Sequence, residues 1–234
     1  MKILIAKDAG YCFGVRDAVN LAYETAEEYG DVYMLGHIVH NENVVKDLDD
    51  AGAKVVRHLD DVPDSKPILF RAHGTATHVW SDAQEKGKHV IDATCPLVTK
   101  VHLEAIRFSR EGYTILLIGH EGHDEVIGTM GEAPEAILLV ESPQDVDQLD
   151  LPTDARLAYL TQTTLSVDDA NRIIDRIRER FPQVQGPPRE DICYATQNRQ
   201  EAVRKLAQEA DVVLVLGSQN SSNSQRLKEL AQEY

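Results

Sequence analysis

Three cysteines, Cys12, Cys95 and Cys193, are the residues of this sequence with the most distinctive chemistry. Their number is odd and none belongs to a C-x-x-C pair, which disfavours a disulfide framework, a zinc ribbon and a thioredoxin-type site. Three unrelated buried thiols are the ordinary interpretation of such a set. Three thiolates gathered at one point would instead hold an iron–sulfur cluster and leave one iron free of protein ligands, or hold a three-iron cluster. An open iron would bind a substrate oxygen, as the open position of a catalytic zinc does.

The surroundings of the cysteines favour a shared site, because they repeat along the chain. A helical pattern of apolar residues follows each cysteine over 15–29, 98–108 and 196–210, and an apolar strand follows each helix over 32–35, 114–118 and 212–216. Each strand ends at a glycine that stands 24 residues beyond its cysteine, and these glycines are Gly36, Gly119 and Gly217. Four residues further on stand His40, His123 and Ser221, each in a short polar loop.

This repeat predicts an α/β protein of three pseudo-threefold-related lobes, with small parallel sheets around a central cavity. We assign residues 13–95 to the first lobe, 96–186 to the second, and 1–12 with 187–234 to the third. Ligands bind at the carboxyl ends of parallel strands, where the loops converge. The cysteines and the polar loops are therefore expected to face one centre.

A further strand follows in the first two lobes, over 67–70 and 156–160, and leads to the segments 71–74 and 161–164. By the same repeat, the third counterpart would fall at about residues 254–261. That position lies beyond Tyr234, so we expect the third lobe to be incomplete and the chain to be a fragment of a longer one.

The polar loops hold candidate ligands for an anion. Their side chains, helped by backbone N–H groups at adjacent helix starts, could supply several hydrogen-bond donors. These donors are His40, His73, His123, Ser221, Ser222 and Asn223. Glu125, in the same loop two residues after His123, is the natural proton donor. The Thr163 hydroxyl could position or relay that proton.

Charge and composition exclude several classes. The chain has 24 Lys and Arg against 39 Asp and Glu, a formal charge of −15, which argues against nucleic-acid binding. No run approaches the roughly 18 apolar residues of a membrane span. The N-terminus lacks a secretory pattern and is more typical of a buried strand, so a cytoplasmic location is expected.

Eight segments carry a specific resemblance to a known family. They are AGYCFGV (9–15), VHNENVV (39–45), RAHG (71–74), DATCPLVTKVH (92–102), GHDEVIGTMG (122–131), TQTTLSV (161–167), DICYATQNRQEAV (191–203) and GSQNSSNSQRL (217–227). On these motifs the sequence is identified as a member of the 4-hydroxy-3-methylbut-2-enyl diphosphate reductase (IspH/LytB) family, and the resemblance covers essentially the whole chain.

The resemblance implies a role for each candidate residue. Cys12, Cys95 and Cys193 match the ligands of a [4Fe–4S] cluster. The diphosphate-binding set is matched by His40, His73, His123, Ser221, Ser222 and Asn223. Glu125 matches the acid that delivers a proton, and Thr163 the threonine beside the substrate hydroxyl. The strand Lys2–Ala6 is implied to belong to the third lobe, in whose missing part the family has another serine.

The implied reaction is the last step of the non-mevalonate isoprenoid pathway. It is a reductive dehydroxylation of (E)-4-hydroxy-3-methylbut-2-enyl diphosphate to isopentenyl diphosphate and dimethylallyl diphosphate. Ferredoxin or flavodoxin is the implied electron donor.

Two other readings of the residues stay open. An aconitase-type dehydratase or a quinolinate-synthase-like enzyme also uses three cysteines and an open iron, and a dehydratase would turn over without an electron donor. A non-catalytic metal or redox sensor would bind a cluster but no allylic diphosphate.

Overall fold

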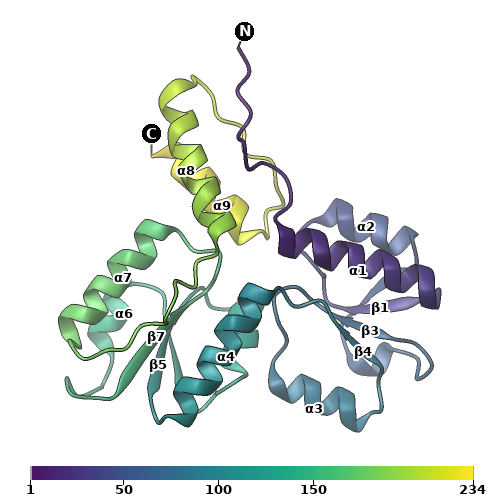
Figure 1. Cartoon of the computed structure of the whole chain (residues 1–234), viewed down its shortest axis with the longest axis horizontal. Coiled ribbons are helices and arrows are strands. Elements are labelled where there is room, and N and C mark those ends of the chain that lie inside the picture. Colours follow the sequence, from purple (N-terminus) through teal and green to yellow (C-terminus); the bar gives the residue numbers. More distant parts are fainter. Residues whose placement is uncertain (1, 234) are drawn as a thin grey trace. The chain divides into compact units, whose positions relative to one another are not determined.

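The computed structural model describes residues 2–233, which fold as two compact units. Unit 1 comprises Met1–Gly10, Glu104–Glu121 and Glu135–Tyr234, and unit 2 comprises Tyr11–Leu103 and Gly122–Pro134. Within each unit a small parallel sheet is combined with helices (Figure 1). The predicted α/β class with small parallel sheets is therefore confirmed, while the three lobe boundaries stay a prediction.

Unit 2 contains a four-stranded parallel sheet in the order β2-β1-β3-β4, with helices on both sides (Figure 1). Its strands are β1 (Val32–Leu35), β2 (Ala53–Val56), β3 (Ile68–Phe70) and β4 (Val90–Asp92). Its helices are α1 (Phe13–Tyr29), α2 (Glu42–Asp50), the 3₁₀ turn η1 (Leu59–Asp61), α3 (Thr77–Glu85), the first part of α4 (Pro96–Arg110), and α5 (Asp124–Met130).

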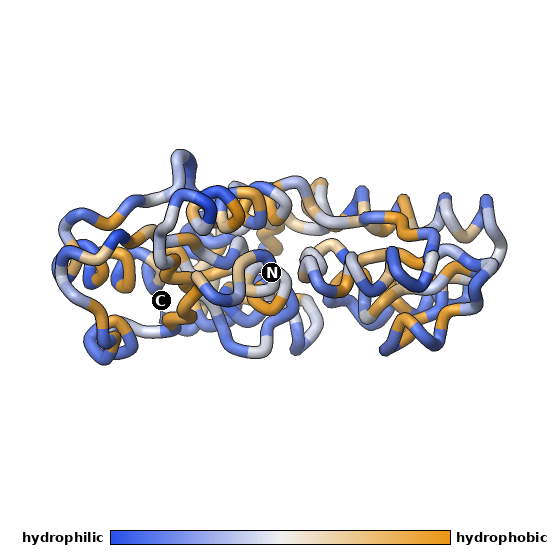
Figure 2. The backbone as a smooth tube through the Cα atoms, turned by 90° about the horizontal axis from the view of Figure 1, so that it is seen from below, coloured by the Kyte–Doolittle hydropathy of each residue, from blue (hydrophilic) through white to orange (hydrophobic). Residues whose placement is uncertain are grey.

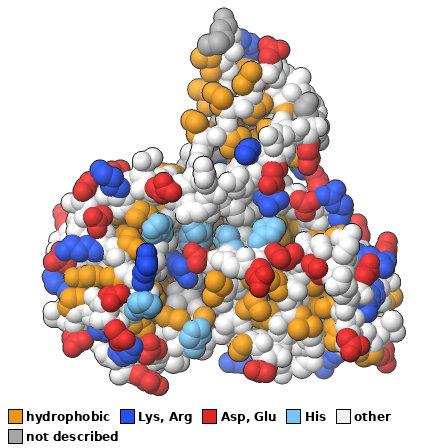
Figure 3. Space-filling view, turned by 180° about the vertical axis from the view of Figure 1, so that it is seen from behind, with side chains coloured by type: hydrophobic (Ala, Val, Ile, Leu, Met, Phe, Trp, Pro, Cys, Tyr) orange, Lys and Arg blue, Asp and Glu red, His pale blue; other side chains and the backbone are white. Residues whose placement is uncertain are grey.

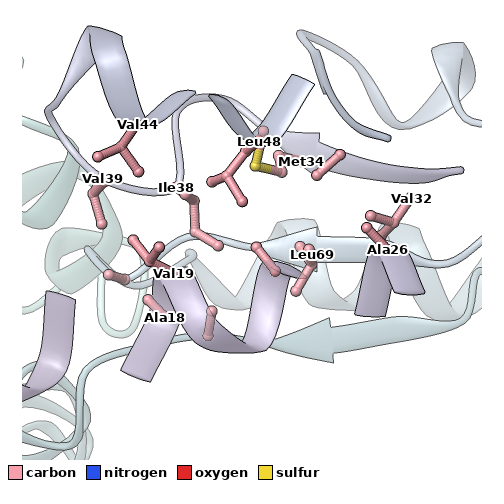
Figure 4. Packing of buried hydrophobic residues seen from close by; sticks show 14 residues of the cluster. Ala18, Val19, Ala26, Val32, Met34, Ile38, Val39, Val44, Leu48 and Leu69 are labelled. Carbon is pink, nitrogen blue, oxygen red and sulfur yellow. The ribbon is translucent and has the colours of Figure 1, made fainter. Parts of the chain in front are cut away.

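The core of unit 2 follows from helical periodicity. Ala18, Val19, Ala22 and Ala26 recur on one face of α1 and are all buried. They share a cluster with Val32, Met34 and Leu69 of the sheet and Leu48 of α2 (Figure 4). This packing fixes the carboxyl ends of β1 and β3, from which the polar loops leave.

Unit 1 contains a three-stranded parallel sheet in the order β6-β5-β7. Its strands are β5 (Thr114–Ile118), β6 (Ile137–Val140) and β7 (Leu157–Thr161). Its helices are the last part of α4, α6 (Pro143–Gln148), α7 (Val167–Arg180), α8 (Tyr194–Glu209) and α9 (Ser222–Gln232). Every residue of β7 is buried although β7 is an edge strand of this sheet, because the segment at Gln185 pairs with its outer side. Along α7, buried Ala170, Ile173 and Ile177 share the helix with charged residues. Figure 2 shows hydrophobic and hydrophilic residues alternating along the backbone.

Two predicted strands are wrong. Residues 212–216 form no strand, and Val212, Leu214 and Leu216 are 73%, 82% and 92% exposed. Lys2–Ala6 likewise forms no strand, and Ile3 and Ile5 are 73% and 82% exposed. A strand requires a neighbour for its backbone N–H and C=O groups, and neither segment joins a sheet within residues 2–233.

Helix length and hydropathy also bear on membrane insertion. Within residues 2–233, no helix combines the length and the apolar character needed to cross a bilayer.

Candidate active site

Three of the predicted anion-binding residues come together in unit 2. The ring centroids of His40 and His73 lie 4.0 Å apart, those of His40 and His123 lie 5.4 Å apart, and those of His73 and His123 lie 6.1 Å apart. On the face drawn in Figure 3, histidine side chains lie among acidic and basic ones. Residues separated by more than 80 positions in the sequence thus form one cluster, called the histidine cluster below.

Backbone hydrogen bonds place the loops that carry this cluster. Ala72 donates its N–H to the carbonyl of Ile38 at 3.1 Å and accepts from the N–H of Cys95 at 3.0 Å. Ala72 therefore ties together the loop before His40, the turn that contains His73, and the start of α4. That turn reverses at Gly74, whose φ of +85° favours glycine.

His123 is held by its own helix. It is the N-cap of α5, and its Nδ1 accepts a hydrogen bond from the Glu125 N–H at 3.1 Å. A ring nitrogen that accepts a hydrogen bond carries no proton, so a neutral His123 has its proton on Nε2. Glu125 stands in the first turn of the same helix and is 2% exposed.

Burial lowers the pKa values of His40 and His73 and so favours their neutral forms. Desolvation lowers the pKa of His40, with Arg71 and His37 acting in the same direction and Asp124 against them. For His73 the pKa lies well below its ordinary value, because of burial first and then the neighbouring His40, His123 and Arg71.

Several polar atoms of the histidine cluster have no hydrogen-bond partner among residues 2–233, although His40 Nε2 lies 4.0 Å from a carboxylate oxygen of Asp124. Both ring nitrogens of His40 and Nδ1 of His73 are buried without a hydrogen bond among the described residues. Arg71 stands beside them, with Nη1 2.7 Å from a carboxylate oxygen of Asp124. Buried polar atoms are almost always satisfied, so orphaned ones point to a ligand. An anion with several oxygens would satisfy these nitrogens.

Two of the three cysteines lie in unit 2, each directly before the first residue of a helix. Cys12 is the N-cap of α1, and Cys95 directly precedes Pro96, the first residue of α4. A Cβ built on Gly14 would lie 2.5 Å from the Cys95 Sγ and 3.2 Å from its Cβ. The Cys95 thiol therefore lies against the first turn of α1, and both cysteines stand at helix N-termini, which favour negatively charged groups.

The third cysteine repeats this arrangement in unit 1. Cys193 is the N-cap of α8, and its Sγ accepts from the Thr196 N–H at 3.4 Å and lies 3.0 Å from the Thr196 hydroxyl. Its own N–H donates to the carbonyl of Thr163 at 3.0 Å. Thr163 is 5% exposed, and this hydrogen bond places its backbone against the N-terminus of α8, where the third thiol stands.

The predicted serines and asparagine also lie in unit 1, at the start of α9. Ser221 is its N-cap and accepts from the Ser224 N–H. Ser222 donates to the carbonyl of Thr164 at 3.3 Å. Asn223 Oδ1 is buried without a partner among residues 2–233. This loop is thus tied to the segment that follows β7.

Sequence reasoning missed Gln162, which organises this region. Its side chain is 1% exposed; Nε2 donates to Thr164 Oγ1 at 2.9 Å and to Ser222 Oγ at 3.4 Å, and Oε1 accepts from the His120 N–H at 3.1 Å. Its position inside the TQTTLSV segment was the available signal.

The candidate residues fall into two sets by unit. Unit 2 holds Cys12, Cys95, the histidine cluster and Glu125, and unit 1 holds Cys193, Thr163 and residues 221–223. The roles assigned to the residues of each set stay predictions. That the two sets form a single site stays a prediction.

The donor set fits an iron–sulfur cluster. None of the three cysteines forms a disulfide, all are half-buried, and thiolates are the ligands that such clusters require. The absence of a side chain at Gly14 leaves room beside the Cys95 thiol, at the end of α1 that Cys12 caps. We conclude that the residues present suit the group.

Comparisons with known proteins agree with this geometry. The family model described as "LytB protein" matches residues 3–234. A 4-hydroxy-3-methylbut-2-enyl diphosphate reductase from Rhodopirellula baltica is 59% identical over 234 residues, which are 100% of this chain and 73% of that protein. The protein of the same name from Mycolicibacterium paratuberculosis is 52% identical over 231 residues, 98% of this chain and 70% of that one.

Solved structures share the fold. The E-1-hydroxy-2-methyl-but-2-enyl-4-diphosphate reductase from Plasmodium falciparum matches with a TM-score of 0.93 at 41% identity, over 96% of this chain and 71% of that chain. A structure of (E)-4-hydroxy-3-methyl-but-2-enyl diphosphate reductase, described as the terminal enzyme of the non-mevalonate pathway, matches with a TM-score of 0.76 at 35% identity, over 99% and 82%. Fold and cysteine placement define an α/β protein with thiols at three helix N-termini. The chain belongs to the LytB protein family.

Proposed function

We propose that this chain carries out the reductive dehydroxylation of (E)-4-hydroxy-3-methylbut-2-enyl diphosphate, the last step of the non-mevalonate pathway. The substrate takes up two electrons and two protons, loses its hydroxyl as water, and yields isopentenyl diphosphate and dimethylallyl diphosphate. The observation that carries the proposal is the histidine cluster with its orphaned ring nitrogens, in the same unit as two thiols at helix starts. The relatives' names agree with it.

The histidine cluster binds the diphosphate. His40 and His73 are neutral in the free protein, and a nearby dianion favours their protonated forms because opposite charges attract. Protonation turns the orphaned nitrogens into charge-assisted donors. This local gain offsets the repulsion that the formal charge of −15 exerts on an anion.

Glu125 delivers a proton to the departing hydroxyl. Its position two residues after His123 keeps it beside the diphosphate-binding histidine, and its burial shields it from water. Unit 1 would contribute further hydrogen-bonding groups. The Thr163 hydroxyl would bind the substrate hydroxyl, and the diphosphate would be bound by the side chains of Ser221, Ser222 and Asn223.

Cys12, Cys95 and Cys193 would hold a [4Fe–4S] cluster. When bound, this group supplies the two electrons and a Lewis-acid position beside the substrate. Ferredoxin or flavodoxin would deliver the electrons, in the cytoplasm.

Anaerobic turnover tests the proposal. The cluster is reconstituted in the full chain, the hydroxymethylbutenyl diphosphate and a chemical reductant are added, and products are separated. Formation of both five-carbon diphosphates, dependent on the reductant, is expected. Conversion without a reductant would indicate a hydro-lyase, and a cluster-loaded protein that neither binds nor converts the diphosphate would indicate a sensor; either result overturns the proposal.

A further inference from the structure

A buried pair of ionisable side chains joins α4 to α5 in unit 2. His102 Nδ1 lies 2.9 Å from Glu132 Oε1, and the two side chains are 10% and 8% exposed. The other carboxylate oxygen of Glu132 accepts from the hydroxyl of Thr77, the first residue of α3, at 2.7 Å. One carboxylate thus links the segment after α5 to two other helices.

The edge of the His102 ring formed by Cε1 and Nε2 packs against two glycines, Gly74 and Gly128. A Cβ built on Gly74 would lie 2.7 Å from both Cε1 and Nε2 of His102. A Cβ on Gly128 of α5 would lie 3.2 Å from the Gly74 carbonyl oxygen and 3.3 Å from His102 Nε2. The imidazole therefore lies where the turn that follows His73 meets α5.

The same turn and helix meet again one turn further on. A Cβ on Gly131 would fall 2.2 Å from the Cβ of Ala76 and 3.0 Å from its Cα. The segment 73–76 is consequently in close contact with the C-terminal half of α5, at Gly128 and Gly131, and Glu132 of the buried pair directly follows this contact.

The carboxylate of this pair stays ionised. Burial acts to raise the pKa of Glu132, but the hydrogen bonds from His102 and Thr77 outweigh it, and the pKa lies below its ordinary value. A buried charge that loses a partner is strongly unfavourable, so the three side chains act together.

We propose that His102 and Glu132 are positioning residues, which set the separation between His73 and the α5 residues His123 and Glu125. Neither is among the residues assigned to the substrate or to the cluster. His73 immediately precedes Gly74, and His123 and Glu125 lie at the start of the helix that contains Gly128. A shift of the turn against α5 therefore changes the distances within the histidine cluster.

The kinetic part of this inference rests on the proposed function. A displacement of about 1 Å at a reacting site costs on the order of 100-fold in rate. Removal of the Glu132 carboxylate is expected to raise KM for the diphosphate and to lower kcat. The spectrum of the iron–sulfur cluster should be retained, because neither His102 nor Glu132 adjoins a cysteine in the sequence.

Three variants of the full chain test the inference. Glu132→Ala removes the link, Glu132→Gln keeps hydrogen-bonding oxygen and nitrogen atoms in place, and His102→Asn keeps a donor near the position of Nδ1. Asp31→Ala is the matched control, since it breaks the exposed Asp31–Lys54 pair of the same unit. The readouts are the imidazole nitrogen–proton NMR signals of His73 and His123 and the affinity for inorganic pyrophosphate.

We expect Glu132→Ala to shift both sets of imidazole signals and to weaken pyrophosphate binding about tenfold. Glu132→Gln is expected to restore most of both, and Asp31→Ala to change neither. Unshifted imidazole signals with unchanged pyrophosphate affinity, at a reduced thermal midpoint, would reduce the pair to a structural role and overturn the inference. If Glu132→Ala does not fold, the same comparison is made with Glu132→Gln and His102→Asn.

The two proposals fail separately. The NMR signals require neither substrate nor reductant. If they shift in Glu132→Ala while the wild-type chain does not convert the diphosphate, the positioning role is upheld and the reductase function is rejected. Normal turnover in Glu132→Ala with unshifted signals would reject the positioning role and uphold the reductase function.

Discussion

The thiol of Cys95 occupies the space where a side chain on Gly14 would stand, with Sγ 2.5 Å from that Cβ position. In helix interiors glycine is unfavourable by about 1 kcal/mol relative to alanine. Here the missing side chain admits the thiol to the N-terminus of α1, next to Cys12. The sequence of α1 is therefore adapted to the cysteine rather than to the helix.

The first prediction follows from this contact. Gly14→Ala would force the Cys95 thiol away and destabilise unit 2 by about 1–3 kcal/mol, because overpacking displaces neighbours. Iron and sulfide bound per chain after reconstitution should fall. Asn20→Ala, at an exposed position of α1, serves as the control and should retain the metal. Full iron content in Gly14→Ala would contradict the fit of the cluster to this place.

The second prediction concerns proton uptake. His40 and His73 have lowered pKa values, caused chiefly by burial, and a bound dianion raises them. The complex then holds more protons than the free protein, so pyrophosphate affinity falls as the pH rises through the pKa values of the complex. Calorimetry in buffers of different ionisation enthalpy measures the uptake. The His73→Asn variant should take up fewer protons than the wild type, and equal uptake would show that His73 does not respond to the ligand.

The third prediction concerns stability and pH. A histidine with a lowered pKa in the folded state binds fewer protons there than in the unfolded chain, so stability rises with pH across the window from its folded pKa to the ordinary 6.5. As the pH falls below 6.5, His73 thus lowers the free energy of unfolding, at a slope of up to about 1.4 kcal/mol per pH unit. Denaturant unfolding at several pH values should show a shallower loss in His73→Asn. His78→Gln, on the exposed side of α3, should follow the wild type.

The fourth prediction addresses the acid. Glu125→Gln keeps the size of the side chain and removes its transferable proton, so kcat should fall by about 10²–10⁴. The cluster spectrum and pyrophosphate affinity should persist. Glu135→Gln, an exposed substitution close by in the sequence, should leave turnover intact. Undiminished turnover in Glu125→Gln would remove this residue from the mechanism.

The fifth prediction concerns Gln162. Its replacement by alanine would leave the His120 N–H and the Thr164 hydroxyl without this partner and would remove one of the hydrogen bonds of the Ser222 hydroxyl. An unsatisfied buried group costs about 1–3 kcal/mol. Chemical denaturation should show a loss of this size, whereas the exposed Gln183→Ala should lie within experimental error of the wild type.

The repeat around the cysteines was sufficient to predict much of this fold. A helix follows each cysteine, and all three cysteines stand at helix N-termini, because the apolar spacing of α1, α4 and α8 is visible in the sequence. The histidine cluster was predicted because His40 and His123 share a register after buried strands. Local pattern and topology suffice for such features.

Features that depend on contacts between distant segments were not predictable in this way. The run Val212–Leu216 has the composition of a buried strand, but composition does not supply a neighbouring strand, and the segment stays extended and exposed. His102 and Glu132 lie 30 residues apart and meet through glycines on two other segments. No periodicity marks such a pair, because a single contact has no repeat.

The exposed segment 212–216 has a practical consequence. Five consecutive β-branched or leucine side chains with an open backbone resemble the short sequences that stack between copies of a chain. Concentrated solutions of this protein should therefore scatter light increasingly with time, and the effect should grow with ionic strength as the repulsion from its net negative charge is screened. A lysine in place of Leu214 should keep the solutions clear, since a charge within such a stretch opposes stacking.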